Sequence, residues 1–190
     1  MAMAKETFPI LNFDKSPTAV LEPGALISAT DFPDHCVICF FAEVIEWLIE
    51  TYDVRVLAYS VSEMGKHPLY EIDFEGKRLA FFYPGVGAPL ATALFEEMIA
   101  RGCTKFIACG GCGVLDKDIA VGHLLLPVSA IREEGTSYHY LPPSREVEAD
   151  LNAVAAIETV LLRHGVDHLR TKTWTTDAIY RETPAKAEAY

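Results

Sequence analysis

Residues 84–115, PGVGAPLATALFEEMIARGCTKFIACGGCGVL, decide the fold of this chain. They contain a glycine-rich turn, a segment with apolar residues at helical spacing, a short apolar strand and a second glycine-rich turn. Pro89 suits the first turn of the helix, and Arg101 followed by Gly102 is typical of a helix end. The pattern predicts a turn–helix–strand–turn unit of an open α/β sheet.

The two turns carry the glycines of a candidate ligand site. One turn follows an apolar strand at residues 79–83, and the other, Gly-Gly-Cys-Gly, follows a strand at residues 105–109. Ligands of open α/β sheets bind outside the carboxyl ends of neighbouring parallel strands. A turn without side chains exposes backbone N–H groups to an anion or a sugar hydroxyl, and three glycines in four residues permit positive φ and close approach of a ligand. We expect the floor of a small-molecule site at Gly85, Gly87, Gly110, Gly111, Cys112 and Gly113. Tight packing of the helix on the sheet would explain the first two glycines equally well.

The rest of the chain continues the alternation of strands and helices. Strands are predicted at residues 18–22, 36–41, 54–59, 123–131 and 168–176, with a hairpin formed by 67–74 and 77–83, and helices at 42–51, from about 146 to 164, and from 184 onward. Pro127 indicates an edge or a bulge in its strand. No repeat or linker interrupts the pattern, so we expect one domain over residues 1–190. Because the last helix is cut short at Tyr190, we expect the C-terminal part of that domain to be missing from this sequence.

Composition and charge limit the function classes. The chain is 51% hydrophobic and 23% charged, as globular proteins are. A net charge of -11 argues against nucleic-acid and anionic-membrane partners, which need basic surface. No apolar run approaches the roughly 20 residues of a membrane helix, and the N-terminus lacks the pattern of a secretory signal. We expect a soluble, cytoplasmic protein.

The cysteine spacing could suggest zinc, because Cys36/Cys39 and Cys109/Cys112 are both C-x-x-C pairs. The first pair lies on a predicted strand, where positions i and i+3 face opposite sides of the sheet and cannot chelate one ion. We therefore expect reduced thiols and no metal.

A dinucleotide cofactor is also not expected. Gly85-x-Gly87 resembles the start of the G-x-G-x-x-G fingerprint, but Leu90 stands at its third glycine. The acidic residue expected about 20 positions further on would fall near Lys105, within a buried strand.

Residues 133–140, EEGTSYHY, form an acidic and aromatic loop that contains Glu134 and His139. Such a loop could stack a base and hold a sugar, or be a solvated loop at a subunit contact. Ser137, His139 and Asp177 could form a triad on paper, but the chain has no G-x-S-x-G elbow. A lone histidine is more often structural than catalytic.

Three segments together resemble the nucleoside phosphorylase family, which includes uridine phosphorylase and hexameric purine nucleoside phosphorylase: residues 85–115, residues 128–150 and residues 174–180, WTTDAIY. The resemblance implies a three-layer α/β/α domain with a mixed, partly barrel-like sheet. It implies a homo-oligomer, dimer or hexamer, and cleavage of the N-glycosidic bond of a nucleoside with phosphate as co-substrate and no other cofactor. By this resemblance the glycine turns form the site floor, Glu134 and His139 line its rim, and Ile179 and Tyr180 pack on the base.

The chain departs from the family pattern where phosphate and uracil would be bound. The resemblance implies two phosphate-binding arginines, but this chain has Ser28 near the first position and Ala108 at the second. It likewise has Gly111 where the family has a hydroxyl residue, and Ile10 where the family has a histidine. The residues that read uracil have no equivalent in 181–185, so a purine or modified base is the better expectation.

Three residues could replace the missing phosphate arginines: Lys66, His67 and Arg132. The catalytic acid is unassigned, because the family's ribose-binding carboxylate and acid would lie beyond Tyr190. The readings are a phosphorylase, a phosphate-independent nucleoside hydrolase, or a nucleoside-binding module without catalysis.

Overall fold

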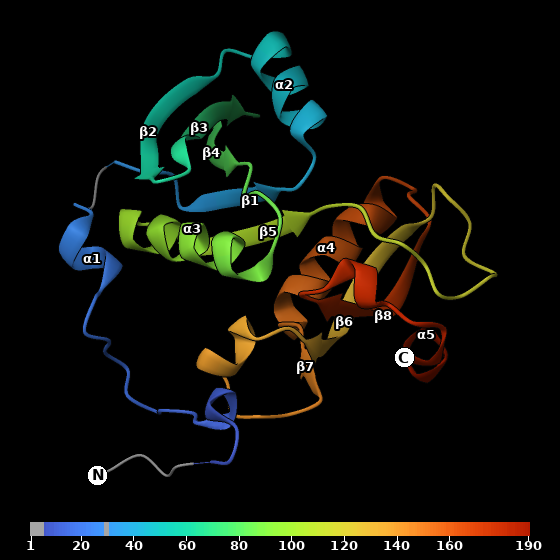
Figure 1. Cartoon of the computed structure of the whole chain (residues 1–190). Helices are drawn as coiled ribbons and strands as arrows, with labels where there is room; N and C mark the ends of the chain where they lie inside the picture. The colour runs from blue at the N-terminus through green and yellow to red at the C-terminus, as the bar shows by residue number, and fades with distance from the viewer. Residues whose placement is uncertain (1–5, 29–30) are drawn as a thin grey trace. The chain divides into compact units, whose positions relative to one another are not determined.

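The computed structural model describes residues 6–28 and 31–190, which form two compact units (Figure 1). The first unit is residues 16–112, and the second combines the N-terminal segment up to residue 15 with residues 113–190.

The first unit is a three-layer α/β/α sandwich around a mixed five-stranded sheet, as predicted. The strands are β1 (His35–Cys39), β2 (Arg55–Ser62), β3 (Gly65–Phe74), β4 (Lys77–Phe82) and β5 (Lys105–Cys109), and the helices are α1 (Pro23–Leu26), α2 (Ala42–Thr51) and α3 (Ala88–Arg101). The sheet order is β2-β3-β4-β1-β5. β1 is parallel to both β4 and β5, whereas β2, β3 and β4 form an antiparallel meander.

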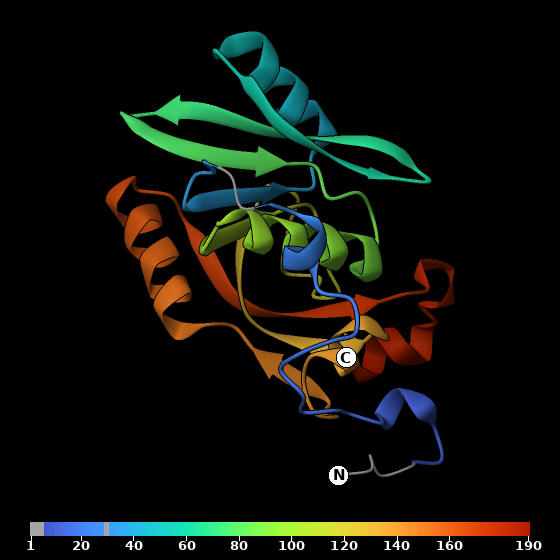
Figure 2. The ribbon, with the colours of Figure 1, turned by 90° about the vertical axis from the view of Figure 1, so that its left-hand side faces the viewer.

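Helices α2 and α3 lie on opposite faces of this sheet (Figure 2). Each face carries its own apolar core. Leu94 and Met98 of α3 pack on the face that contains Cys36, and Ile45 of α2 packs on the face that contains Cys39. The two cysteines therefore lie on opposite faces, as the strand periodicity predicted.

The order of the strands corrects one expectation. The two glycine turns follow β4 and β5, which were expected to be neighbours, but β1 lies between them. Both turns still leave the same edge of the sheet, because the three strands are parallel. Pairing order depends on contacts distant in sequence, which local patterns do not report.

The second unit has a three-stranded sheet in the order β7-β6-β8. Its elements are η1 (Pro9–Leu11), β6 (Leu124–Glu133), η2 (Thr136–His139), β7 (Glu146–Glu148), α4 (Leu151–Arg163), β8 (His168–Thr176), η3 (Ile179–Arg181) and α5 (Pro184–Ala189). β6 pairs antiparallel with β7 and parallel with β8. The β6–β8 register shifts between Pro127 and Ser129, which confirms the irregularity predicted from the proline.

Two predicted elements were wrong. Residues 18–22 are not a strand: they are exposed and irregular, and no strand among the described residues pairs with their backbone. The helix expected from residue 146 begins at Leu151, because residues 146–148 pair with β6. Asp150 caps α4, its side chain accepting a hydrogen bond from the Ala153 N–H.

In the part of the chain that the structure describes, no helix combines the length and apolar character needed to cross a bilayer.

Candidate functional site

The first glycine turn has a backbone that only glycine adopts easily. Gly85 and Gly87 have φ of +74° and +108°. A Cβ added at Gly85 would lie 2.6 Å from Leu90 Cδ2, so a side chain would also collide with α3. Gly87 precedes the first residue of α3, and its carbonyl accepts from the Ala91 N–H. The turn thus presents the N-terminus of a helix, whose first N–H groups have no partner within the helix and suit an anion.

The second turn has no glycine with positive φ, and of its glycines Gly110 is the one that close packing requires. Gly110 and Gly111 have no left-handed backbone. A Cβ at Gly110 would lie 3.0 Å from the Phe40 Cβ, at the end of β1. At Gly111 a Cβ would be 3.5 Å from Phe41 Cε1, which is an ordinary contact. Close approach is therefore required at Gly110, and Gly111 leaves room for a small side chain.

Two thiols lie beside the second turn. Cys39 and Cys109 are paired residues of the parallel strands β1 and β5. Burial and the neighbouring Cys39 raise the pKa of the Cys109 thiol to about 11. Cys109 is therefore protonated at neutral pH and is a poor nucleophile. Both Cys109 and Cys112 are exposed residues, and Cys112 lies on the turn itself.

The acidic loop of the second unit is shaped by its own carboxylates. Glu134 is 8% exposed and accepts from both the backbone N–H of Ser137, at 2.8 Å, and the Ser137 hydroxyl. Asp177 Oδ2 accepts from the Gly135 N–H at 2.8 Å. His139 is exposed at the end of η2. Ser137 thus bonds within the loop, and Asp177 bonds to the backbone of the loop at Gly135. No Ser-His-Asp triad is assembled among these described residues.

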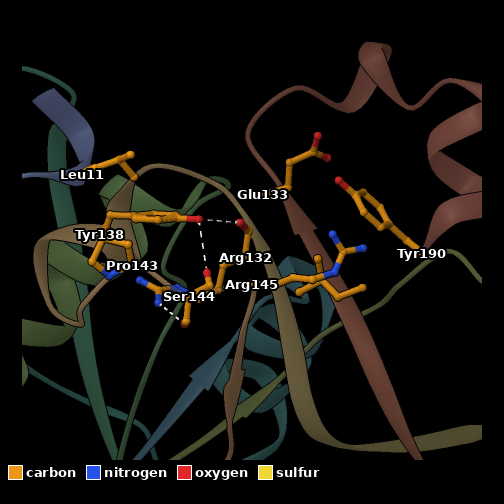
Figure 3. Close-up of a pocket in the computed structure, with 9 residues that line it drawn as sticks. Leu11, Arg132, Glu133, Tyr138, Pro143, Ser144, Arg145 and Tyr190 are labelled. Atoms are coloured by element: carbon orange, nitrogen blue, oxygen red, sulfur yellow. Dashed lines mark hydrogen bonds between the residues drawn. The ribbon is translucent and has the colours of Figure 1, made fainter. Parts of the chain in front are cut away.

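Arg132 holds the far side of the same loop, where its guanidinium donates to several acceptors. Its side chain is 6% exposed. Nε donates to Ser137 Oγ at 2.8 Å, and Nη1 donates to Pro142 O at 2.8 Å and to Ser144 Oγ at 2.7 Å. The guanidinium also lies 4.4 Å from the ring centre of Tyr138 (Figure 3). Phosphate binding by Arg132 stays a prediction, and these bonds within the loop do not favour it.

The other two candidates for phosphate lie on β3. Lys66 Nζ lies 5.7 Å from the ring centre of Tyr59. His67 Nε2 is buried and has no hydrogen-bond partner among the described residues. These observations do not show a site for an anion at Lys66 or His67, so phosphate binding by these residues stays a prediction.

Ile179 and Tyr180 are surface residues of η3, 68% and 97% exposed. They lie two and three residues after Asp177, so the bond between Asp177 and Gly135 joins their segment to the acidic loop. The second unit therefore brings the predicted rim and base-packing residues onto neighbouring segments.

A cavity of about 480 Å³ in the second unit lies beside this loop (Figure 3). It is lined by Leu11, Ile131, Arg132, Glu133, Tyr138, Pro143, Ser144, Arg145 and Tyr190. The Glu133 carboxylate accepts from Trp174 Nε1 at 2.8 Å and from Lys186 Nζ. Arg132, a candidate phosphate ligand, lines this cavity, whereas the predicted floor, rim and base-packing residues do not.

Sequence reasoning missed the roles of Arg132 and Asp177 in the loop. Asp177 was considered only as a triad member and Arg132 only as an anion ligand. The signal that pointed to them was their place at the two strand ends that flank the acidic loop. In the described residues no group of three His, Cys, Asp or Glu side chains is placed to hold a metal ion.

Comparison with known proteins identifies the family. A family model described as "Phosphorylase superfamily" matches residues 34–190. The chain therefore belongs to the phosphorylase superfamily, as the sequence motifs predicted.

Two curated relatives match part of the chain. A guanosine phosphorylase of Halorubrum lacusprofundi is 32% identical over 80 residues, which are 42% of this chain and 33% of the relative. A uridine phosphorylase of Thermococcus kodakarensis is 30% identical over 107 residues, 56% of this chain and 39% of the relative. The matched regions thus span between a third and two fifths of these relatives.

Two solved structures share the fold. A purine nucleoside phosphorylase from Toxoplasma gondii, in complex with immucillin-H, has a TM-score of 0.73 at 21% identity, covering 84% of this chain and 64% of its own. An AMP nucleosidase from Bacteroides thetaiotaomicron has a TM-score of 0.70 at 26% identity, covering 84% of this chain and 63% of its own.

Proposed function

We propose that the protein is a nucleoside phosphorylase-type enzyme that cleaves the N-glycosidic bond of a nucleoside with phosphate. The observation that carries the proposal is the superfamily match over residues 34–190, because it includes all three motif segments. A guanosine phosphorylase and a uridine phosphorylase are both among the relatives. A purine or modified base is favoured, since residues 181–185 lack the uracil readers that the family resemblance implies.

The proposed reaction breaks the bond between ribose C1′ and the base nitrogen and forms a bond from C1′ to a phosphate oxygen. Positive charge develops on the ribose and negative charge on the departing base, which must receive a proton. Donors fixed in advance where charge develops lower such a barrier. In this proposal the donors include the backbone N–H groups at the start of α3, and the proton donor is unassigned.

The site residues keep their predicted roles as part of the proposal. Gly85, Gly87, Gly110, Gly111, Cys112 and Gly113 form the floor for phosphate, ribose and base. Glu134 and His139 line the rim, with Glu134 acting through the loop that it caps. Ile179 and Tyr180 pack on the base, and both side chains are exposed and therefore accessible to it. We also propose a homo-oligomer, dimer or hexamer.

A second candidate is a phosphate-independent nucleoside hydrolase. Two observations favour it: the similarity to an AMP nucleosidase, and the commitment of Arg132 to the acidic loop. A nucleosidase transfers the sugar to water, so it needs no phosphate site. A nucleoside-binding module without catalysis is the third possibility.

Base release from purine and pyrimidine nucleosides, with and without phosphate, tests these proposals. The purified protein is incubated with inosine, guanosine, adenosine and uridine, and both base and sugar products are separated by chromatography. Release that requires phosphate and yields ribose 1-phosphate supports a phosphorylase. Release of free ribose at the same rate without phosphate supports a hydrolase. Nucleoside binding without release of base would contradict both enzymatic readings.

A further inference from the structure

Asp177 links two segments that the proposed function places at the nucleoside. It stands one residue beyond β8, whose last pair with β6 is Thr176 with Glu133. Its carboxylate Oδ2 accepts from the Gly135 N–H at 2.8 Å, and its own N–H donates to the Glu133 carbonyl. The Asp177 side chain therefore adds a hydrogen bond between the two segments just beyond the last residue pair of β6 and β8.

The Asp177 carboxylate lies within ordinary contact distance of Gly135. A Cβ added at Gly135 would lie 3.7 Å from Asp177 Oδ2, so the carboxylate packs directly against this glycine. Asp177 is exposed, and its bond competes with water. The acceptor of this bond, the Asp177 carboxylate, is charged, and a charged acceptor forms a stronger hydrogen bond than a neutral one.

The other polar contacts of the loop have a different effect. Glu134 and Arg132 both bond to Ser137, and Arg132 also reaches Ser144. These contacts fix the shape of the loop itself. The Asp177 contact fixes where the start of that loop lies against the segment that carries Ile179.

We propose that Asp177 is a positioning residue for nucleoside binding. It holds the loop of residues 134–139 in a fixed position relative to residues 179–180. The inference rests on the proposed function, because it assigns the two segments to one nucleoside. Asp177 does not touch the reacting atoms in this account. Its loss should weaken nucleoside binding and leave the chemical step largely intact.

The test compares Asp177→Ala with Asp150→Ala. The control loses the same kind of bond, from the Ala153 N–H to Asp150 Oδ1 at 2.8 Å, at the start of α4. We expect Asp177→Ala to raise KM for the nucleoside up to about tenfold, the factor that one hydrogen bond can supply. kcat should stay within about twofold, because such a split indicates lost uniform binding. Asp150→Ala should leave both constants near the wild-type values.

Asp177→Asn provides the conservative variant. Its amide oxygen can accept the same bond without the charge, so KM should lie between those of the wild type and Asp177→Ala. It also serves as the test variant if Asp177→Ala does not fold. Amide hydrogen exchange of the peptide containing Gly135 provides a readout that does not depend on turnover, and protection should fall in Asp177→Ala only.

Several outcomes would overturn the inference. Equal KM values for Asp177→Ala and Asp150→Ala would show that the link does not serve binding. A large fall in kcat at unchanged KM would place Asp177 in the chemistry rather than in positioning. If the wild-type protein neither binds nor cleaves nucleosides, the proposed function fails first and the positioning role falls with it. Exchange at Gly135 would then still show whether the bond exists in solution.

Discussion

Replacing Glu71 by glutamine should be among the most destabilising conservative changes in the first unit. Glu71 lies on β3 with no exposed side-chain surface and faces two arginines. It accepts from Arg78 Nε at 3.0 Å and Nη2 at 2.8 Å, and from Arg55 Nη2. Arg78 is in turn bonded to Asp31.

The magnitude follows from these contacts. Breaking a buried ion pair by removing one charge costs roughly 3–5 kcal/mol. Glutamine keeps one acceptor oxygen, and the two arginine side chains are 38% and 64% exposed and can regain water. We therefore expect a loss of about 3 kcal/mol in the free energy of unfolding, at the lower end of that range. This is a large part of the roughly 5–15 kcal/mol that stabilises a typical protein.

The assay uses the tryptophan of the first unit as its probe. The chain has two tryptophans, and Trp47 lies in the first unit while Trp174 lies in the second. In a Trp174→Phe background, urea unfolding followed by Trp47 fluorescence reports the first unit. Glu63→Gln, an exposed glutamate in the β2–β3 turn, is the matched control and should change stability by less than about 0.5 kcal/mol.

The pH dependence has a definite sign. Hydrogen bonds from Arg78, and then the charges of Arg78 and Arg55, hold the pKa of the Glu71 carboxyl below its usual 4.5. The wild type therefore keeps this stabilisation above pH 4.5 and loses it as pH falls through the lowered pKa. The difference between wild type and Glu71→Gln should be constant from pH 7 to pH 5 and shrink below pH 4.5. A loss at pH 7 no larger than that of Glu63→Gln would refute the reasoning.

Three other changes test the turns and the thiols. Gly85→Ala should lower the free energy of unfolding by about 1–2 kcal/mol, because alanine is strained at φ +74°; an unchanged urea midpoint would contradict this. Gly111→Ala should change stability by less than about 0.5 kcal/mol, since its Cβ would have normal contacts, yet it should raise KM if this turn is the site floor. Alkylation of Cys109 by iodoacetamide, followed by peptide mass spectrometry, should accelerate from pH 7 to pH 10 without a plateau, because its pKa is about 11. A plateau by pH 9 would show that its thiol is more acidic than its surroundings imply.

Local sequence patterns predicted most elements because each carried its own start or end signal. The helix from Ala88 to Arg101 has proline near its start and glycine after its end, and β8 was predicted with the bounds that the structure shows. Residues 18–22 carried only the composition of a strand. A strand needs a partner, and composition does not show whether one is present. Asp150 was a readable helix cap that the periodicity argument overlooked.

The candidate site was harder to predict, because the role of a polar side chain depends on what surrounds it. Arg132 in an acidic, aromatic loop could have been an anion ligand or a structural clamp. Its donors reach acceptors between residues 137 and 144, and only the fold of that loop shows that they are engaged. The glycines show the same ambiguity. Gly85 is required by its backbone and Gly110 by the side chain of Phe40, so neither needs a ligand to explain it.

These assignments narrow how the proposed enzyme could hold phosphate. The two phosphate-binding arginines that the family resemblance implies are replaced here, with Ser28 near one position and Ala108 at the other, and Arg132 bonds within its own loop. What the first glycine turn does offer is the N-terminus of α3, whose first backbone N–H groups have no partner within the helix, Pro89 contributing none. Such a site binds an anion through backbone dipoles instead of full charges, and each charge–dipole contact contributes less than a guanidinium pair. A phosphorylase built this way would bind phosphate weakly, and a hydrolase would not need to bind it, so the phosphate dependence of base release is the property on which the two proposals differ most.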